Sequence, residues 1–412
     1  MSRYRLYPSA QQEAVLSRHC AHARYVWNLA VEQHAHWQPG RRSAPGYIEQ
    51  CRQLTAARAE NQWLREGSQM VQQQALRDFA QAIAHYFSGT HRRPRWRKAG
   101  RDEGFRVVAV KSGDVRRLNR NWGQVRVPKA GWIRFRQSRA VPAGVKSFRV
   151  TQDRGGRWHV AFAAIPDPVP APSNGQVVGI DRGVVVSVAL STGEMLTVSG
   201  LSAREQRRLR RLQRQLARSR RGSGRRGKTK TAVARLRARE ADRRKDWAEK
   251  ASTDIARRFD MICVEELNIG AMTGSARGTA SQPGRNVAAK ARLNRGILAS
   301  GWGLLVRRLE DKAPGRVEKV TPAFTSQRCS ACGHVDAKSR ESQARFTCTA
   351  CGFACHADVN AARNIAAGHA VTARGGLRDA GPVNRGLQLL ASLPGREAAG
   401  IPCLRAGEDV KG

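Results

Sequence analysis

Four cysteines in two matched turns constrain the fold of this 412-residue chain more than any other feature. Cys329 and Cys332 belong to the sequence CSACG, and Cys348 and Cys351 belong to CTACG, with fifteen residues between the two pairs. A CxxCG turn aims two sulfurs at one point, and two such turns at this spacing are typical of a four-thiolate tetrahedral zinc site. The sequence therefore predicts a zinc ribbon over residues 323–352, where the metal stabilises the fold and performs no hydrolysis.

Other roles for the cysteines are less consistent with the pattern. Two disulfides or a redox CxxC would not require two matched turns, and a reducing compartment disfavours disulfides. Cys355 and His356 lie just outside the pattern, so a fifth or substitute ligand at either position is the alternative that stays open. The isolated cysteines are expected to be ordinary thiols; they are Cys20, Cys51, Cys263 and Cys403.

The charge of the chain predicts a polyanionic partner. Lysine and arginine total 74 against 32 acids, a formal net charge of +42, and most of the bases are arginine. Because arginine pairs bidentately with phosphate and stacks on bases, nucleic acid is favoured over a membrane surface. The bases cluster in residues 92–149 and 201–250, which predicts two nucleic-acid surfaces or one long one. With no long apolar run and no signal peptide, we expect a cytoplasmic protein.

The hydrophobic periodicity predicts an α/β chain of several domains. A short strand over residues 1–8 precedes a helical region that ends near residue 88, and a period of two over 105–165 indicates a small antiparallel barrel or sheet. The stretch PDPVPAPSNG at 166–175 is typical of a linker. Beyond it we expect a strand, a hairpin, basic helices at 201–220 and 229–258, a strand, a helix at 288–312 and a strand at 316–321.

Three acids stand where rigid elements begin or end. Asp181 and Glu265 each end an apolar strand, and Asp358 opens a helical run. Clustered carboxylates can hold two Mg²⁺ ions for phosphodiester hydrolysis. The alternatives are a helix cap for Asp358 and an edge-strand solubilising role for Glu265. The order of elements matches an RNase H-like nuclease, and this favours the catalytic interpretation.

One motif is rejected on its context. The sequence GSGRRGKT, residues 222–229, matches the phosphate-loop pattern GxxxxGK[ST]. That loop requires a hydrophobic strand before it, whereas RRLRRLQRQLARSRR predicts a basic helix. We expect a flexible basic turn between two helices, close to a phosphate backbone.

These motifs together resemble the TnpB family, the compact RNA-guided nucleases of bacterial insertion sequences and relatives of type V CRISPR effectors. GIDRG is similar to the first RuvC motif and includes Asp181. VEELN is similar to the second motif, which assigns the catalytic role to Glu265 rather than Glu266. HADVNAARNI is similar to the third motif and includes Asp358. The family's RxDxxxK helix is matched by Arg244, Asp246 and Lys250, although Glu249 stands where His is usual.

The resemblance implies an architecture with five parts. A wedge β-barrel would comprise residues 1–8 and 92–172, with a helical recognition domain inserted at 9–91. An RNase H-like RuvC nuclease domain would comprise 173–322 and 353–372, interrupted by the zinc ribbon. Residues 373–412 would form a disordered tail.

The resemblance also implies the partners and the reaction. The chain would bind a guide RNA from its own element, recognise double-stranded DNA beside a short adjacent motif, and cut it with Asp181, Glu265 and Asp358 holding two Mg²⁺ ions. A monomer with one RNA is favoured, located at the bacterial nucleoid when bound to DNA. The alternatives are a nuclease-inactive RNA-guided DNA-binding regulator, a transposase or accessory DNA-binding protein, and a structural zinc protein of the chromatin type.

Overall fold

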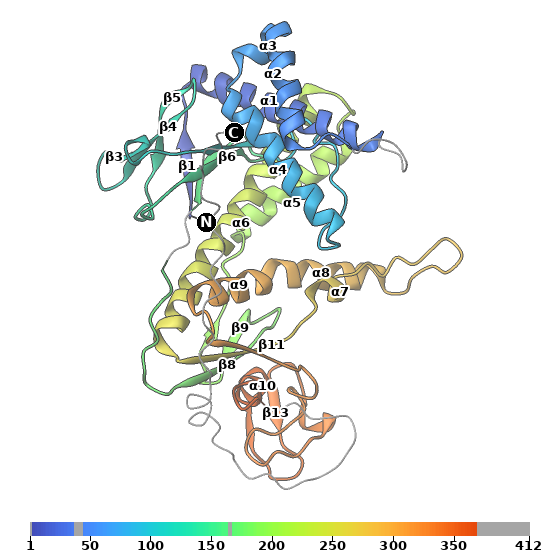
Figure 1. The fold of residues 1–412 in the computed structure, drawn as a ribbon. Coiled ribbons are helices and arrows are strands. Elements are labelled where there is room, and N and C mark those ends of the chain that lie inside the picture. Colours follow the sequence, from blue (N-terminus) through green and yellow to red (C-terminus); the bar gives the residue numbers. More distant parts are fainter. Residues whose placement is uncertain (1, 37–43, 164–166, 369–412) are drawn as a thin grey trace. The chain divides into compact units, whose positions relative to one another are not determined.

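The computed structural model describes residues 2–36, 44–163 and 167–368, and the chain forms two compact units (Figure 1). Unit 1 comprises Met1–Pro168 and Val198–Lys250, and unit 2 comprises Val169–Thr197 and Ala251–Gly412. The first boundary falls within the predicted proline-rich linker. The expected tail at 373–412 lies outside the described residues. No helix in the described ranges is both long and apolar enough to cross a membrane.

A seven-stranded antiparallel sheet forms the first half of unit 1. Its order is β2-β6-β7-β1-β5-β4-β3. The strands are β1 (Ser2–Tyr7), β2 (Gly104–Val108), β3 (Val115–Arg117), β4 (Trp122–Val127), β5 (Gly131–Arg136), β6 (Ser147–Gln152) and β7 (Trp158–Ala163). The antiparallel prediction is confirmed. Within the described ranges β2 and β3 are not paired with each other, so closure into a barrel stays a prediction.

Four helices lie between β1 and β2 in unit 1. They are α1 (Ala10–Ala35), α2 (Tyr47–Glu60), α3 (Gln62–Glu66) and α4 (Gln69–Phe87). Of these, α1 and α4 pack against the sheet. After Pro8 ends the first strand, Ser9 caps α1 in a reciprocal pair of hydrogen bonds with Gln12. Leu16 of α1 and Phe79 of α4 share one core with Phe135 and Phe162 of the sheet. The predicted helical region is therefore confirmed, with its apolar faces turned to the sheet.

The two predicted basic helices are α5 (Ala203–Arg218) and α6 (Gly224–Arg258). Helix α6 begins at Gly224, before the predicted start at 229, so the flexible turn expected over residues 222–229 is wrong for most of that segment, which is helical. They form a hairpin through a small apolar cluster of Leu201, Leu209 and Leu236. Glu205 of α5 accepts from Arg239 and Arg243 of α6 at 2.7 Å each. Apart from the last turns of α6, this hairpin belongs to unit 1. The predicted division assigned these helices to the RuvC domain, whereas the two compact units place most of them in unit 1. The predicted domain division stays a prediction.

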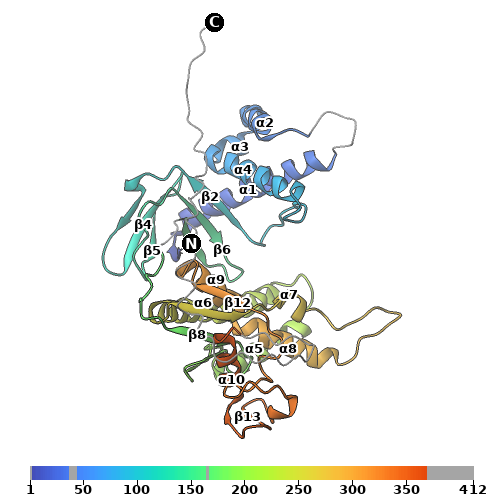
Figure 2. The ribbon, with the colours of Figure 1, turned by 60° about the horizontal axis from the view of Figure 1, so that its bottom comes forward.

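Unit 2 contains a five-stranded mixed sheet of order β10-β9-β8-β11-β12 (Figure 2). The strands are β8 (Val177–Asp181), β9 (Val188–Leu190), β10 (Met195–Leu196), β11 (Met261–Glu265) and β12 (Val317–Val320). The hairpin strands pair antiparallel, whereas β8, β11 and β12 are parallel. The strand, hairpin and later parallel strands follow the predicted order.

The helices of unit 2 are α7 (Ile269–Met272), α8 (Val287–Ser300), α9 (Trp302–Lys312) and α10 (Ala357–Ala366). The single helix predicted at 288–312 is wrong, because Gly301 adopts φ +74° and separates α8 from α9. A residue in the left-handed conformation commonly ends a helix, because the chain changes direction there and cannot continue the helical hydrogen-bond pattern. A two-stranded ribbon of β13 (Arg345–Thr347) and β14 (Ala354–His356) lies beside α10 in Figures 1 and 2.

Candidate active site and metal centre

Two of the predicted acids end neighbouring parallel strands. Val264 of β11 pairs with Ile180 of β8, and Glu265 and Asp181 are the next residues of these strands. The carboxyl ends of parallel strands meet at one edge of a sheet, where ligands bind in open α/β folds. Strand β11 lies between β8 and β12, so Glu265 is not on an edge strand. Glu266 is exposed, whereas Glu265 is partly buried, and only Glu265 belongs to this site.

The third acid reaches the same edge through the packing of α10 on β8. A Cβ atom on Gly179 of β8 would lie 1.9 Å from the carbonyl oxygen of Ala362 in α10. Only glycine therefore permits this close approach of helix and strand. Asp358 is in the first turn of α10 and is buried. His356 is the residue that caps the helix, accepting at Nδ1 from the N–H of Asp358 at 3.2 Å. The cap interpretation of Asp358 is therefore wrong.

The three acids interact electrostatically. Burial, together with the nearby Glu265 and Asp358 carboxylates, raises the pKa of Asp181 to about 7. Burial also raises the pKa of Glu265. Desolvation and like charge both disfavour ionised carboxylates, and a bound cation would relieve both effects. Raised pKa values from these two causes are typical of functional sites.

Three further side chains hold the acids in place. The Thr325 hydroxyl donates to Oε1 of Glu265 at 2.7 Å, and this lowers the pKa of Glu265 against the effect of burial. Arg340 donates to Oδ1 of Asp358 at 3.2 Å. The buried Arg182 donates to the backbone oxygen of Glu265. The site thus has three acids and two guanidinium groups, and the guanidinium groups compensate part of the negative charge.

The four cysteines of the predicted ribbon meet at a second centre. Among the described residues they are the only group of three or more His, Cys, Asp or Glu side chains gathered closely enough for one ion, with all four sulfurs within 4.8 Å of one another. The sulfurs of Cys329 and Cys351 are 3.8 Å apart, and those of Cys332 and Cys348 are 3.6 Å apart. A tetrahedral ion with ligands at 2.3 Å requires a separation of about 3.8 Å. The cluster therefore fits one tetrahedral metal ion.

The two cysteine turns are built alike. The N–H of Gly333 donates to the carbonyl oxygen of Cys329 at 2.9 Å, and the N–H of Gly352 donates to the carbonyl oxygen of Cys348 at 3.0 Å. Both glycines have positive φ, +80° and +72°, which lets each turn close. Backbone N–H groups, chiefly that of Cys351, lower the pKa of Cys348 to about 6. A thiolate is the form of cysteine that binds metal.

The alternative ligands lie outside this cluster. Cys355 is in β14, and burial raises the pKa of its thiol. Nδ1 of His356 is used to cap α10. Neither residue belongs to the group of four sulfurs.

The sulfur cluster and the acid site are connected through α10. The Asn360 side chain accepts from the N–H of Ser330 at 2.9 Å and donates to the carbonyl of Arg328 at 2.7 Å. Asn364 donates to the carbonyls of Thr325 and Arg328 at 2.9 and 2.7 Å. Both asparagines are buried. The same helix that carries Asp358 therefore also fixes the first cysteine turn.

The motif HADVNAARNI contains Asn360 and Asn364 without assigning a role to them, and Thr325 falls within the predicted ribbon range without a role. Arg182 stood in GIDRG and was likewise unassigned. Arg340 had no sequence signal, because it lies between the two cysteine turns and reaches Asp358 only through the folded ribbon. All three predicted acids do lie at one edge of unit 2, although their ligand atoms are not gathered as closely as the sulfurs.

One face of the unit 1 sheet is basic and aromatic. The Arg116 guanidinium lies 4.2 Å from the ring centroid of Trp132, and Arg134 and Arg136 lie 5.2 and 5.5 Å from that of Trp122. Alternate residues on the same strands, such as Ile133, are fully buried. These tryptophans therefore lie on the face opposite the core. Interleaved arginine and aromatic side chains are typical of nucleic-acid surfaces.

Family comparisons match most of the chain. The family described as "Probable transposase" matches residues 159–276, "Cas12f1-like, TNB domain" matches 302–365, and "Helix-turn-helix domain" matches 2–38. The first match contains Asp181 and Glu265. The second contains the four cysteines and Asp358. Over the described part of the third match, the structure forms strand β1 and the single helix α1.

Two relatives match over nearly their full length. The Escherichia coli (strain K12) protein named "Putative RNA-guided DNA endonuclease InsQ" is 37% identical, covering 92% of this chain and 94% of that protein. A Streptomyces pristinaespiralis protein named "Putative RNA-guided DNA endonuclease" is 34% identical over 98% of both. The solved structure titled "Cryo-EM structure of the Cas12f1-sgRNA-target DNA complex" is similar in fold, with a TM-score of 0.53 at 14% identity. It covers 87% of this chain and 83% of that one.

Proposed function

The chain belongs to the TnpB family, and we propose that it is an RNA-guided endonuclease that hydrolyses DNA phosphodiester bonds at the three-carboxylate site of unit 2. The observation that carries the proposal is the electrostatic coupling of Asp181 with Glu265 and Asp358 at one sheet edge. Ionised carboxylates that are buried close to one another are costly unless a cation occupies their site. Its two near-full-length relatives carry names with the same activity.

Magnesium fits this site. Carboxylate oxygens are the ligands that Mg²⁺ prefers, and Asp181, Glu265 and Asp358 would hold it. When bound, two Mg²⁺ ions supply an activated water and neutralise the charge on the leaving oxygen. The fit rests on the gathering of the three acids at one sheet edge, where burial first, and then the charges of Glu265 and Asp358, raise the pKa of Asp181 even though Arg340 acts to lower it.

The chain's own residues prepare the site. Thr325 orients Glu265 through its hydroxyl, and Arg340 orients Asp358. Arg182 fixes the end of β11 through the backbone oxygen of Glu265. Glu265 and Asp358 are thus each held by a side-chain donor at the place where they act. Hydrolysis by water would leave a 5′ phosphate and a 3′ hydroxyl.

Zinc is the ion we assign to the sulfur cluster. Four thiolates at tetrahedral spacing favour it, and a closed four-cysteine site is structural. Its role is to fold the ribbon that supplies Arg340 and supports α10. The RNase H-like fold of unit 2, with this ribbon inserted, is part of the same proposal.

A guide RNA and a double-stranded DNA target are the partners. The arginine and tryptophan face of the unit 1 sheet and the basic hairpin of α5 and α6 provide surfaces for polyanions. Base pairing with the guide would select the target sequence, while the protein would read backbone shape and the adjacent motif.

Copurification followed by cleavage tests the proposal. The protein is purified with RNA co-expressed from its element, the RNA is sequenced, and a plasmid library with matching targets and randomised flanks is added with Mg²⁺. We expect one RNA species and cuts only in plasmids that share a flanking motif. Guided binding without cuts would instead identify a DNA-binding regulator. Joining of element ends would identify a transposase. If no RNA copurifies, the proposal that the chain uses a guide RNA fails.

A further inference from the structure

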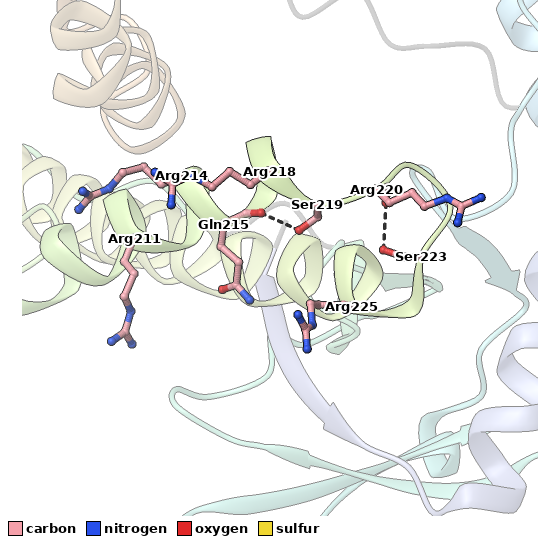
Figure 3. Close-up of a pocket in the computed structure, with 8 residues that line it drawn as sticks. All are labelled: Arg211, Arg214, Gln215, Arg218, Ser219, Arg220, Ser223 and Arg225. Atoms are coloured by element: carbon pink, nitrogen blue, oxygen red, sulfur yellow. Dashed lines mark hydrogen bonds between the residues drawn. The ribbon is translucent and has the colours of Figure 1, made fainter.

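Five arginines line a hollow of about 780 Å³ where α5 ends and α6 begins (Figure 3). They are Arg211, Arg214, Arg218, Arg220 and Arg225, and all are exposed. No acid in the described ranges forms an ion pair with any of them. The nearby acids are used elsewhere, since Glu205 pairs with Arg239 and Arg243 and Glu240 pairs with Arg237. The hollow is therefore a concentration of uncompensated positive charge.

The chain itself holds the turn of this hairpin in shape. Arg226 donates to the carbonyl oxygens of Leu216 and Ser219 at 2.5 and 3.0 Å. Gly222 has φ +83°, which allows the reversal of direction. The turn is thus ordered by a sixth arginine that points inward, while the five lining arginines stay available to a ligand.

The arrangement favours an extended polyanion over a free nucleotide. No aromatic or apolar side chain lines the hollow for a base, and no acid lines it for a magnesium ion. Figure 3 shows the guanidinium groups spread along the hairpin rather than converging on one point. From Arg211 to Arg218 the helix rises about 10 Å, which corresponds to about three phosphates at roughly 3.4 Å of axial rise each.

The neutral lining residues favour RNA over DNA. Gln215, Ser219 and Ser223 stand among the arginines. The Ser219 hydroxyl donates to the carbonyl of Gln215 at 2.6 Å, so its oxygen remains able to accept. The Ser223 hydroxyl donates to the carbonyl of Arg220 at 2.9 Å and already accepts from the N–H of Arg226 at 3.2 Å, which leaves it one lone pair. A DNA backbone offers acceptors only, whereas the 2′-hydroxyl of RNA can also donate.

We propose that this hollow binds the sugar-phosphate backbone of the guide RNA, an inference that rests on the proposed function. It accounts for the phosphate-loop pattern at residues 222–229. Lys228 and Thr229 lie within α6, and the Thr229 hydroxyl donates to the carbonyl of Arg225, so the segment is not a nucleotide loop. Its first residues instead form the end of the arginine hollow, and the rejection of a nucleotide loop is consistent with the structure.

The test measures RNA binding by the full chain without Mg²⁺. The combined variant Arg211→Gln, Arg214→Gln, Arg218→Gln is compared with a charge-matched control, Arg65→Gln, Arg154→Gln, Arg257→Gln, whose residues are also exposed and lie outside the two basic clusters. The probes are a fluorescein-labelled RNA hairpin and the DNA hairpin of the same sequence. We expect the hollow variant to bind the RNA about tenfold more weakly or worse and to lower the salt slope by about 2, with a smaller change for DNA.

The outcomes separate this inference from the proposed function. Equal losses for the hollow variant and the control would overturn the inference, because net charge alone would explain them. A greater loss on DNA than on RNA would overturn the choice of RNA. If the unaltered chain binds no RNA, the proposed function fails and the inference with it. A folding defect is excluded by Arg211→Lys, Arg214→Lys, Arg218→Lys, which should keep the salt slope and recover most of the affinity.

Discussion

The sulfur cluster and the acid site are both candidate metal centres, but they are built in opposite ways. The four sulfurs come from two short turns and already lie at tetrahedral spacing. The three acids come from two strand ends and a helix start, and they are less closely gathered and partly compensated by arginine. The first centre resembles a closed structural site, whereas the acids of the second are not gathered around a single point. The predictions below test this difference.

The largest expected effect is on cleavage, through Asp181→Asn. The change keeps the shape of the side chain and removes its charge, so guided cleavage should fall about a thousandfold or more while RNA copurification is unchanged. Glu266→Gln is the matched control, because Glu266 is the exposed neighbour of Glu265, and it should cleave normally. Cleavage by the Asp181 variant, or its loss in the control, would contradict the assignment of the site.

Removal of one cysteine should release the metal from the whole sulfur cluster. Cys348→Ala removes one of four ligands, so elemental analysis should find no bound zinc, and the ribbon should become protease-sensitive. Cleavage should then also be lost, because Arg340 and the turn held by Asn360 depend on the ribbon. Cys355→Ala should retain zinc. Loss of zinc in both variants would mean that the closed four-sulfur site is wrong.

The packing of α10 on β8 can be broken with one methyl group. Gly179→Ala would place a Cβ 1.9 Å from a backbone oxygen of α10, and we expect unfolding of unit 2 to become easier by about 3 kcal/mol. Gly227→Ala, on an open face of α6, should instead be neutral or stabilising by about 0.5 kcal/mol. Denaturant unfolding of both variants measures the contrast, and equal stability would contradict the close approach.

Cleavage and stability should respond oppositely to pH at the acid site. The pKa of Asp181 is raised to about 7 in the folded chain, so the folded state holds this proton more tightly than the unfolded state does. Its contribution to stability without metal is present at acid pH and is lost as pH rises through about 7. Mg²⁺ requires the ionised form, so cleavage should rise over the same range. The prediction would be contradicted if, without metal, the free energy of unfolding of the unaltered chain rose with pH through this range in parallel with that of the Asp181→Asn variant.

The smallest effect is expected from Thr325→Val. Losing the hydroxyl that donates to Glu265 should cost about 1 kcal/mol of unfolding free energy and shift the cleavage profile to higher pH. Thr347→Val is the control, because its buried hydroxyl has no hydrogen-bond partner among the described residues. Denaturant unfolding and the pH profile of cleavage are measured for both variants, and only Thr325→Val should change the pH profile. Identical behaviour of the two variants would show that Thr325 has no role at the acid site.

The sequence predicted the ribbon well because its ligands are local. Two CxxCG turns specify their own geometry, down to the positive φ of Gly333 and Gly352. The acids could be identified by motif, but their approach depends on Gly179 and on parallel pairing across many residues, which no spacing reveals. The break between α8 and α9 at Gly301 was likewise not visible in the hydrophobic periodicity. Arg340 was unpredictable, since only the folded ribbon brings it to Asp358.

The most direct test of the central claim is guided cleavage by the purified RNA complex. A plasmid that carries the sequence matching the copurified RNA is incubated with Mg²⁺ beside a plasmid without the match. The account predicts linear product from the matched plasmid only, and none when Mg²⁺ is chelated while zinc stays bound. Equal cutting of both plasmids, or no cutting of either by the folded complex, would contradict it.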